Sequence, residues 1–298
     1  MGYTYSVIIP HYAIPDLLSE CVESIPVRED IQVIVVDDHS PDGETFPERY
    51  PALRRPGVTF VRTPENLGGG HARNVGLGLA EGKWIVFSDS DDIFTEGAFR
   101  TMDRYSGSDA DIVYFPFCKD EVDGFRTGSK YLWLNNLFDL YRETGDDSRI
   151  RCYHVMPWSK MISRDFVERL GLRFDEIRYS DDVMFNVLAG TGASKVAVGD
   201  EGIYRVRFRE GSVSNPRAWD SNLLYLRAET GMRVNRIIKE KYSYDYDDAY
   251  VSLKNLAFFN FRAFLKLYAK APRNRMSLLR ITREVAAKAL NRLIPVKR

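Results

Sequence analysis

Two short apolar runs separated by an amphipathic segment constrain this chain more than any other feature of its sequence. Residues 5–10 and 31–36 are rich in valine and isoleucine, as is typical of buried strands. Between them, apolar residues recur at helical spacing from Leu17 to Ile25. Strands that are apolar on both faces, with a helix between them, indicate a parallel sheet. We therefore expect an α/β fold in which the first strand ends at Pro10.

Three further strands are predicted at residues 58–62, 84–87 and 111–116. In open α/β sheets, ligands bind beyond the carboxyl ends of the strands. Polar side chains follow the first two strands: His11 and Tyr12 after the first, and residues 37–40 (Asp-Asp-His-Ser) after the second. The sequence therefore places a candidate binding site at this edge of the sheet.

Three carboxylates, Asp89, Asp91 and Asp92, follow the strand at 84–87. If strand geometry persists, Asp89 and Asp91 point to one face, where they would suit a hard divalent cation and phosphate oxygens. The alternative is an acidic loop that begins the next helix, since acidic residues favour helix starts. The cluster alone does not separate these two interpretations.

A glycine-rich turn, residues 68–70, precedes a helix of small residues expected over 72–80. Such a turn can cradle phosphate at a helix N-terminus, and Arg73 could pair with an anion. Tight packing of the helix on the sheet explains the glycines equally well.

A second acidic pair, Asp181 and Asp182, precedes an apolar segment that ends at Leu188. Ser180 or Asp181 can cap a helix there. One cap needs only one residue, so Asp182 is a candidate general base if it faces a cleft.

Residues 204–209 alternate apolar or aromatic side chains with Arg205, Arg207 and Arg209, and Ser212 follows shortly after. This pattern predicts a strand with one basic face, which could either contact a diphosphate or be a solvated edge. From residue 219 the pattern becomes helical, with one helix around 223–237 and another over 251–265.

The tail from residue 270 to residue 298 carries nine Lys or Arg and one acid, Glu284. Its apolar residues recur at helical spacing, so it could lie on an anionic membrane surface. A helix packed on the protein with a solvated basic face, or a homodimer contact, is an equal alternative.

Composition narrows the class of protein. The 298 residues contain 42 Lys+Arg and 42 Asp+Glu, and this zero net charge argues against a nucleic-acid binder. The three cysteines form no CxxC pair, so we expect neither disulfides nor a zinc site, and a cytoplasmic location. No signal peptide and no apolar run long enough to span a bilayer is evident.

In combination, four segments resemble the inverting family 2 glycosyltransferases. Residues 7–12 resemble the opening strand and turn of that family, and residues 34–43 its Val-Asp-Asp-Gly-Ser-x-Asp-Gly motif. Residues 66–68 with 72–74 resemble its Asn-x-Gly and Ala-Arg-Asn segment, and residues 87–92 its Asp-x-Asp motif. The resemblance continues more loosely through residues 158–160 and 174–176 to residues 181–182, and covers roughly residues 4–215.

The resemblance implies a nucleotide-sugar transferase (GT-A) fold. Such a fold has a Rossmann-like, mixed and mostly parallel sheet flanked by helices. We expect this domain over 1–215, with a nucleotide-binding half at 1–116 and an acceptor half at 117–215. Residues 216–298 would form a helical C-terminal extension with the basic amphipathic tail.

The resemblance also implies roles for individual residues. Asp182 would be the catalytic base, with Asp181 as the alternative. Asp91, with Asp89, would bind Mn²⁺ or Mg²⁺ that bridges the donor diphosphate. Acceptor contacts would come from Trp158 and Lys160. Contacts with the donor nucleotide would come from Pro10, Tyr12, Asp37, Asp38, Asn66, Gly68, Arg73, Asp89 and Ser90.

The expected function is metal-dependent, inverting transfer of a sugar from a nucleotide donor, with a UDP-sugar expected, to a glycan or lipid-linked acceptor. Bacterial surface polysaccharide synthesis, at the inner face of the cell membrane, is the expected setting. The chain departs from the family in having His11, His39 and Asp181 where threonine or serine, glycine and glutamate are usual.

Three alternatives remain. A dinucleotide-dependent oxidoreductase would need G-x-G-x-x-G after the first strand, where this chain has Pro-His-Tyr. A sugar nucleotidyltransferase would carry a glycine-rich basic loop there. A non-catalytic module that binds sugar or a protein partner would not need Asp91 and Asp182.

Overall fold

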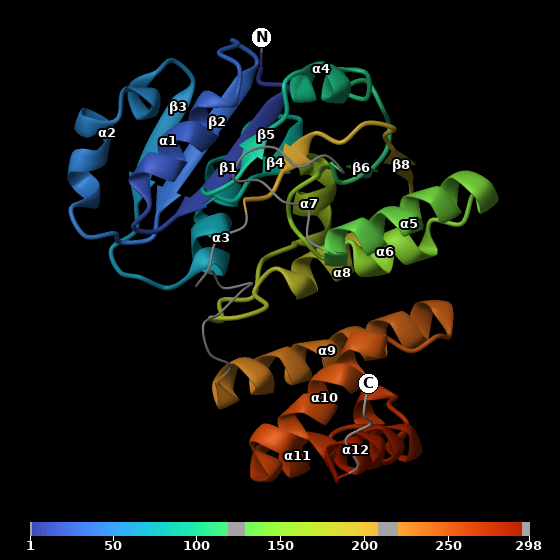
Figure 1. The fold of residues 1–298 in the computed structure, drawn as a ribbon. Helices are drawn as coiled ribbons and strands as arrows, with labels where there is room; N and C mark the ends of the chain where they lie inside the picture. The colour runs from blue at the N-terminus through green and yellow to red at the C-terminus, as the bar shows by residue number, and fades with distance from the viewer. Residues whose placement is uncertain (1, 119–128, 208–219, 294–298) are drawn as a thin grey trace. The chain divides into compact units, whose positions relative to one another are not determined.

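The computed structural model describes residues 2–118, 129–207 and 220–293. The chain divides into two compact units, Met1–Arg209 and Glu210–Arg298 (Figure 1). The predicted domain boundary after residue 215 lies outside the described residues and stays a prediction.

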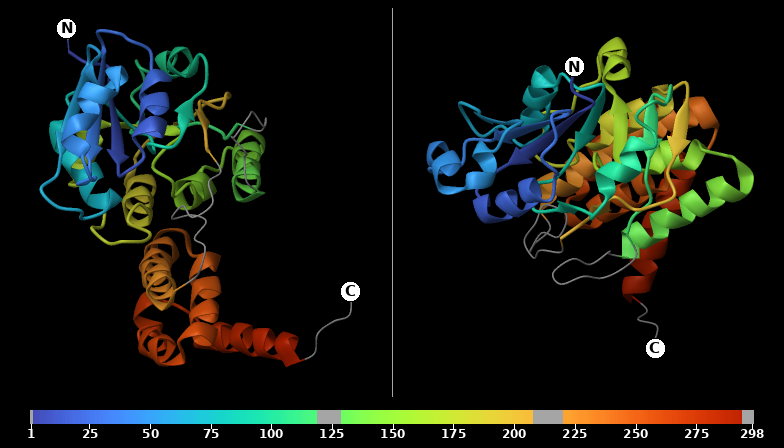
Figure 2. Two further views of the ribbon diagram at one scale, coloured as in Figure 1. Left: turned by 60° about the vertical axis from the view of Figure 1, so that its left-hand side comes forward. Right: turned by 90° about the horizontal axis from the view of Figure 1, so that it is seen from above.

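The first unit is built on a seven-stranded sheet with the order β3-β2-β1-β4-β7-β6-β8. Strands β3, β2, β1 and β4 are parallel, whereas β7 is antiparallel to both β4 and β6. The predicted mixed, mostly parallel sheet is therefore confirmed, and Figure 2 shows helices on both of its faces. The strands are β1 (Tyr5–His11), β2 (Ile31–Asp37), β3 (Val58–Arg62), β4 (Trp84–Phe87), β6 (Ile112–Tyr114), β7 (Lys160–Ser163) and β8 (Val196–Val198).

The helices and short elements of this unit connect the strands. Two residues each of β5 (Ile93–Phe94) and β9 (Tyr204–Arg205) pair in a separate antiparallel ribbon. The helical elements are α1 (Pro15–Glu23), η1 (Gly43–Thr45), α2 (Phe46–Arg49), η2 (Pro51–Arg54), α3 (Gly69–Leu79), α4 (Ala98–Asp103), α5 (Ser129–Thr144), α6 (Ser148–Tyr153), α7 (Arg164–Leu170) and α8 (Val183–Gly192).

Strand β1 does not stop at Pro10 as expected, but continues to His11 opposite Asp37. The reason is the shorter neighbour β4, whose pairing with β1 ends at Ile8 and Phe87. The carbonyl of Ile8 faces β4, where it accepts from Ser88, so the nitrogen of Pro10 faces the same side, beyond the last residue of β4. A proline costs no ladder hydrogen bond there.

The second unit is helical, with α9 (Ser221–Tyr242), α10 (Asp247–Phe259), α11 (Phe261–Tyr268), η3 (Pro272–Asn274) and α12 (Leu278–Leu293). The single helix expected over 251–265 is wrong, because the chain breaks at Asn260, whose side chain caps α11 by accepting from the Ala263 amide. Among the residues that the structure describes, no helix is long and apolar enough to cross a membrane.

Candidate functional site

The carboxyl ends of β1 and β2 carry two aspartates with different surroundings. Asp37 is fully buried, and its carboxylate accepts from Ser40 and lies 2.9 Å from the His11 Nδ1 atom. Burial raises the pKa of Asp37, but the hydrogen bonds with His11 and Ser40 outweigh it and hold the pKa below its ordinary value. Asp37 therefore fixes the turn after β2 from within the protein.

Asp38 connects the same turn to the segment before α3. Its carboxylate accepts from the backbone N–H groups of Leu67 at 3.0 Å and Gly68 at 2.7 Å. The Asn66 amide donates to the Asp38 carbonyl at 2.9 Å. Three residues predicted to contact the nucleotide, Asp38, Asn66 and Gly68, are thus brought together.

Arg73 lies at the centre of the candidate site. Its guanidinium donates to Asp89 at 2.6 Å through Nη2 and to Asp181 at 2.9 Å through Nη1. Burial lowers the pKa of Arg73, but the charges of Asp89 and Asp181 outweigh it, so its pKa lies above the ordinary value. Arg73 therefore joins the two acidic clusters that the sequence places 92 residues apart.

Asp181 and Asp182 approach α3 because α3 begins at glycine. A Cβ atom on Gly70 would lie 2.2 Å from the Asp175 carbonyl oxygen and 3.1 Å from the Asp181 Cβ atom. The helix expected over 72–80 begins at Gly69, so the glycines lie partly inside it. Their observed role is close packing of α3 against the acidic loop.

Two substitutions on α3 test this close approach. Gly70→Ala should destabilise the protein by about 1–3 kcal/mol, since overpacking forces a backbone shift. Gly78→Ala is the matched control, because a Cβ atom there meets nothing within 4 Å. Alanine favours helix, so this control should stabilise by about 0.5–1 kcal/mol. Urea unfolding measures both, and equal midpoints for the two variants would contradict the packing role.

Asp182 sits at the N-cap position of α8, and its side chain makes no capping hydrogen bond. The expectation that Ser180 or Asp181 caps this helix is therefore wrong. Burial and the neighbouring charge of Asp181 raise the pKa of Asp182 to about 7, against the opposing charge of Arg73. Burial also raises the pKa of Asp181, with Arg73 opposing it. A carboxyl group with a pKa near neutrality can exchange a proton at physiological pH.

A buried chain of hydrogen bonds holds the Asp182 backbone. Lys160 is 1 % exposed, and its Nζ atom donates to the His154 carbonyl at 2.8 Å and to the Asn186 Oδ1 atom at 2.9 Å. Asn186 in turn donates to the Asp182 carbonyl at 2.9 Å. Trp158 is buried as well, stacked on Tyr204 with ring centroids 5.0 Å apart. Neither Lys160 nor Trp158 presents its side chain to an acceptor, against the expectation for them.

The three carboxylates after β4 differ in their surroundings. Asp92 is almost fully buried and accepts from the Arg207 backbone N–H at 2.7 Å. Burial, reinforced by the charges of Asp89 and Asp91, raises the pKa of Asp92 well above its ordinary value. Asp89 and Asp91 are partly exposed. The Asp89 backbone N–H donates to the Tyr204 hydroxyl at 2.8 Å.

The basic strand expected at 204–209 is only partly described. Arg207 donates to the Asp91 carbonyl at 3.0 Å and pairs with Glu20, so it connects the loop after β4 to α1. Arg205 pairs with Ile93 in the β5–β9 ribbon. Arg209 and Ser212 lie outside the described residues. Of the remaining predicted residues, Pro10 and Ser90 are buried, whereas Tyr12 is half exposed.

The carboxylates after β4 are the candidate ligands for the predicted divalent cation. Among the described residues, no group of three or more His, Cys, Asp or Glu side chains could hold a metal ion. Asp92 is buried, whereas Asp89 and Asp91 are partly exposed, so these two are the candidate ligands. Mg²⁺ is commonly bound by one or two carboxylates together with substrate phosphates. The residues present therefore fit that arrangement.

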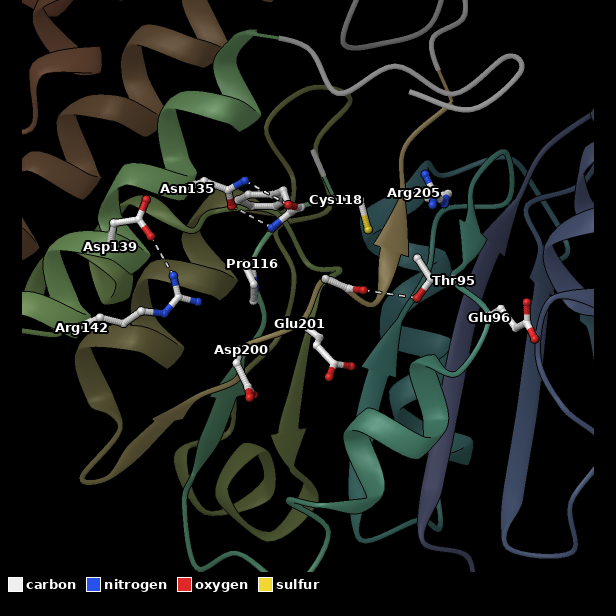
Figure 3. A pocket seen from close by; sticks show the side chains of 12 residues that line it. Thr95, Glu96, Pro116, Cys118, Asn135, Asp139, Arg142, Asp200, Glu201 and Arg205 are labelled. Atoms are coloured by element: carbon white, nitrogen blue, oxygen red, sulfur yellow. Dashed lines mark hydrogen bonds and ion pairs between the residues drawn. The ribbon is translucent and has the colours of Figure 1, made fainter. Parts of the chain in front are cut away.

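A cavity of about 430 Å³ lies beside the β5–β9 ribbon (Figure 3). Arg205 lines it, but none of the carboxylates Asp89, Asp91, Asp181 and Asp182 does. Asp139 and Arg142 point toward each other at its edge, 2.7 Å apart. The cavity and the carboxylate site around Arg73 are therefore separate features.

Comparison with known proteins identifies the family of this chain. The family model for Glycosyl transferase family 2 matches residues 6–171. Three curated relatives each align with 70% of this chain: glycosyltransferase EpsJ and minor teichoic acid biosynthesis protein GgaB of Bacillus subtilis, and succinoglycan biosynthesis protein ExoO of Rhizobium meliloti. Their identities are 30%, 32% and 32%, in the same order. The chain spans 62%, 23% and 61% of their lengths.

Two solved structures resemble the fold. Residues 1–349 of TarS from S. aureus, in complex with UDP-GlcNAc, match with a TM-score of 0.63 and 20% identity, over 91% of this chain and 89% of that 1–349 chain. The mannosyltransferase PcManGT from Pyrobaculum calidifontis, in complex with GDP-Man and Mn²⁺, matches with a TM-score of 0.53 and 18% identity, over 100% of this chain and 89% of the other. At these identities the likeness concerns the fold alone.

Proposed function

The chain belongs to glycosyltransferase family 2, and from this premise we propose that it transfers a sugar from a nucleotide-diphosphate donor to an acceptor hydroxyl, with inversion. The observation that carries the proposal is that Arg73 pairs with Asp89 and Asp181, with Asp182 close enough for its charge to act on Arg73. Family membership favours this reaction over nucleotidyl transfer or a non-catalytic role. The relatives' names support surface polysaccharide synthesis as the setting.

In this proposal the donor lies along the turns that follow β1, β2 and β4. The nucleoside would contact Tyr12 and the turn joined by Asp38, Asn66 and Gly68. Asp37 is fully buried, so its carboxylate would support that turn and would not contact the donor. The UDP-GlcNAc and GDP-Man bound to the structural neighbours support a nucleotide-sugar donor, and we propose a UDP-sugar.

The leaving group is a nucleoside diphosphate, which gains negative charge as the sugar departs. A divalent cation held by Asp91, with Asp89 close by, would offset that charge when bound. Arg205 lines the separate cavity and Arg207 pairs with Glu20, so a contact of the predicted basic strand with the diphosphate stays a prediction. Asp182 would take the proton from the acceptor hydroxyl as it attacks the anomeric carbon. A single displacement of this kind inverts that carbon.

Donor binding tests the proposal directly. We expect one of UDP, GDP and dTDP to bind in calorimetric titration, more tightly with Mn²⁺ than without it. Asp91→Asn should remove the metal dependence, because an amide is a weaker ligand for a hard cation than a carboxylate. The control is Asp139→Asn, on α5 at the edge of the separate cavity, which should bind as wild type does. Failure of every nucleotide to bind folded protein would overturn the proposed donor site.

A further inference from the structure

Helix α11 presents an apolar ridge to solvent. Phe261 is 60% exposed and Leu265, one turn later, is 49% exposed. Phe259, at the end of α10, is 57% exposed. The opposite side of α11 is anchored, since Phe264 and Leu267 are buried. The ridge is therefore held in place by the second unit, and no described residue of that unit covers it.

The surroundings of this ridge are strongly basic. Residues 249–283 contain eight Lys or Arg and no Asp or Glu. Four of these cations pair with acids elsewhere in the second unit: Lys254, Lys270, Arg275 and Arg280. Arg262 and Lys266 are exposed one position beyond Phe261 and Leu265, and within the described residues neither has an ion pair. The apolar ridge and these two charges form one surface, which we call the α11 face.

The positive charge of the α11 face indicates which kind of partner it can bind. In a symmetric dimer the same patch meets itself, so the cations Arg262 and Lys266 of one copy would meet the same two cations of the other copy. Like charges at close range oppose such a contact. An anionic bilayer complements both parts of the α11 face, because its headgroups attract the cations while Phe261 and Leu265 enter the acyl boundary.

The tail helix is less suited to this role. The guanidinium of Arg280 in α12 contacts Asp247 at 2.7 Å and lies 3.9 Å from the centroid of the Tyr250 ring. Lys288 donates to the Asn255 side chain. These charges are engaged inside the second unit, although Leu279 remains 72% exposed.

We propose that the α11 face, formed by Phe259, Phe261, Arg262, Leu265 and Lys266, binds the surface of an anionic lipid membrane. Such binding would hold the enzyme where lipid-linked acceptors lie, but it needs no catalytic step. It therefore stands apart from the proposed transferase reaction, and donor binding in solution reports on that reaction alone.

Vesicle co-sedimentation of the full chain tests the proposal. The vesicles are phosphatidylcholine alone, or phosphatidylcholine with about 30% phosphatidylglycerol, in about 0.1 M salt. Wild type should bind the anionic vesicles at least about tenfold more tightly than the neutral ones. Phe261→Ser with Leu265→Ser, and separately Arg262→Gln with Lys266→Gln, should each weaken binding about tenfold or more.

The matched control is Leu279→Ser, which removes a leucine of α12 that is more exposed than Leu265 (72% against 49%) and should bind as wild type does. Circular dichroism and donor binding check that each variant is folded. Loss of binding in Leu279→Ser but not in the α11 variants would overturn the proposal. Equal binding to both vesicle types would also overturn it. The same holds if the protein binds no vesicles and instead forms a dimer that Phe261→Ser dissociates.

Discussion

Asp182→Asn should lower kcat for sugar transfer by about 10²–10⁴-fold, the range expected for loss of a general base. The amide has nearly the same shape, so the Asn186 hydrogen bond to the backbone carbonyl of residue 182 and donor binding should survive. KM for the donor should therefore change little. The measurement is steady-state kinetics with the nucleotide found in the titrations.

The pH profile separates this role from a structural one. Because the pKa of Asp182 is about 7, and the base acts as a carboxylate, kcat should rise with pH through about 7 and then level off. Below that pH the group is protonated and cannot accept the acceptor's proton. The residual rate of Asp182→Asn should lack this limb.

Two further variants complete this test. Asp165→Asn changes an exposed carboxylate at the start of α7 and should keep the wild-type profile. Asp181→Asn should alter kcat less than Asp182→Asn, because the Asp181 carboxylate is paired with Arg73. If Asp181→Asn instead removes the limb at pH 7, the base is Asp181.

Much of the sheet could be predicted because its signals are local. The runs at 58–62 and 84–87 coincide with β3 and β4, and neighbouring β-branched residues alone identify them. Strand β7 was not predicted: it has only four residues and lies in the sheet as the antiparallel neighbour of β4. Its pairing depends on contacts across more than 70 residues, which periodicity does not carry.

The candidate site, like the sheet, could be predicted only in part. Motif spacing selected Arg73, Asp89, Asp181 and Asp182. In the structure Arg73 pairs with Asp89 and Asp181, and the charge of Asp182 acts on Arg73. The sequence did not reveal that Asn74 holds the acidic loop, where it exchanges two hydrogen bonds with the Phe174 backbone. Nor did it reveal that Lys160 is buried and linked through Asn186 to the Asp182 backbone, since lysine side chains are mostly exposed in proteins. Such roles arise from long-range packing.

Arg73→Met should destabilise the protein by about 2–4 kcal/mol, below the full value for a buried pair because Asp89 is partly exposed. Methionine is similar in length but carries no charge, so Asp89 and Asp181 lose the cation between them. The carboxylates then repel each other, and the pKa values of Asp181 and Asp182 should rise further. Urea unfolding at pH 7 measures the loss, and we expect donor binding to weaken as well.

The dependence of this loss on pH identifies its cause. Arg73 favours the ionised forms of Asp181 and Asp182. Its contribution to stability is therefore present at neutral pH and is lost as these two carboxylates become protonated. The difference in unfolding free energy between wild type and Arg73→Met should therefore shrink as the pH falls toward 4. Arg142→Met breaks the exposed pair with Asp139 and should cost about 0.5 kcal/mol or less. A pH-independent loss in Arg73→Met would mean that Arg73 acts through packing on Phe174, whose ring centroid lies 5.5 Å from its guanidinium carbon, and not through its charge.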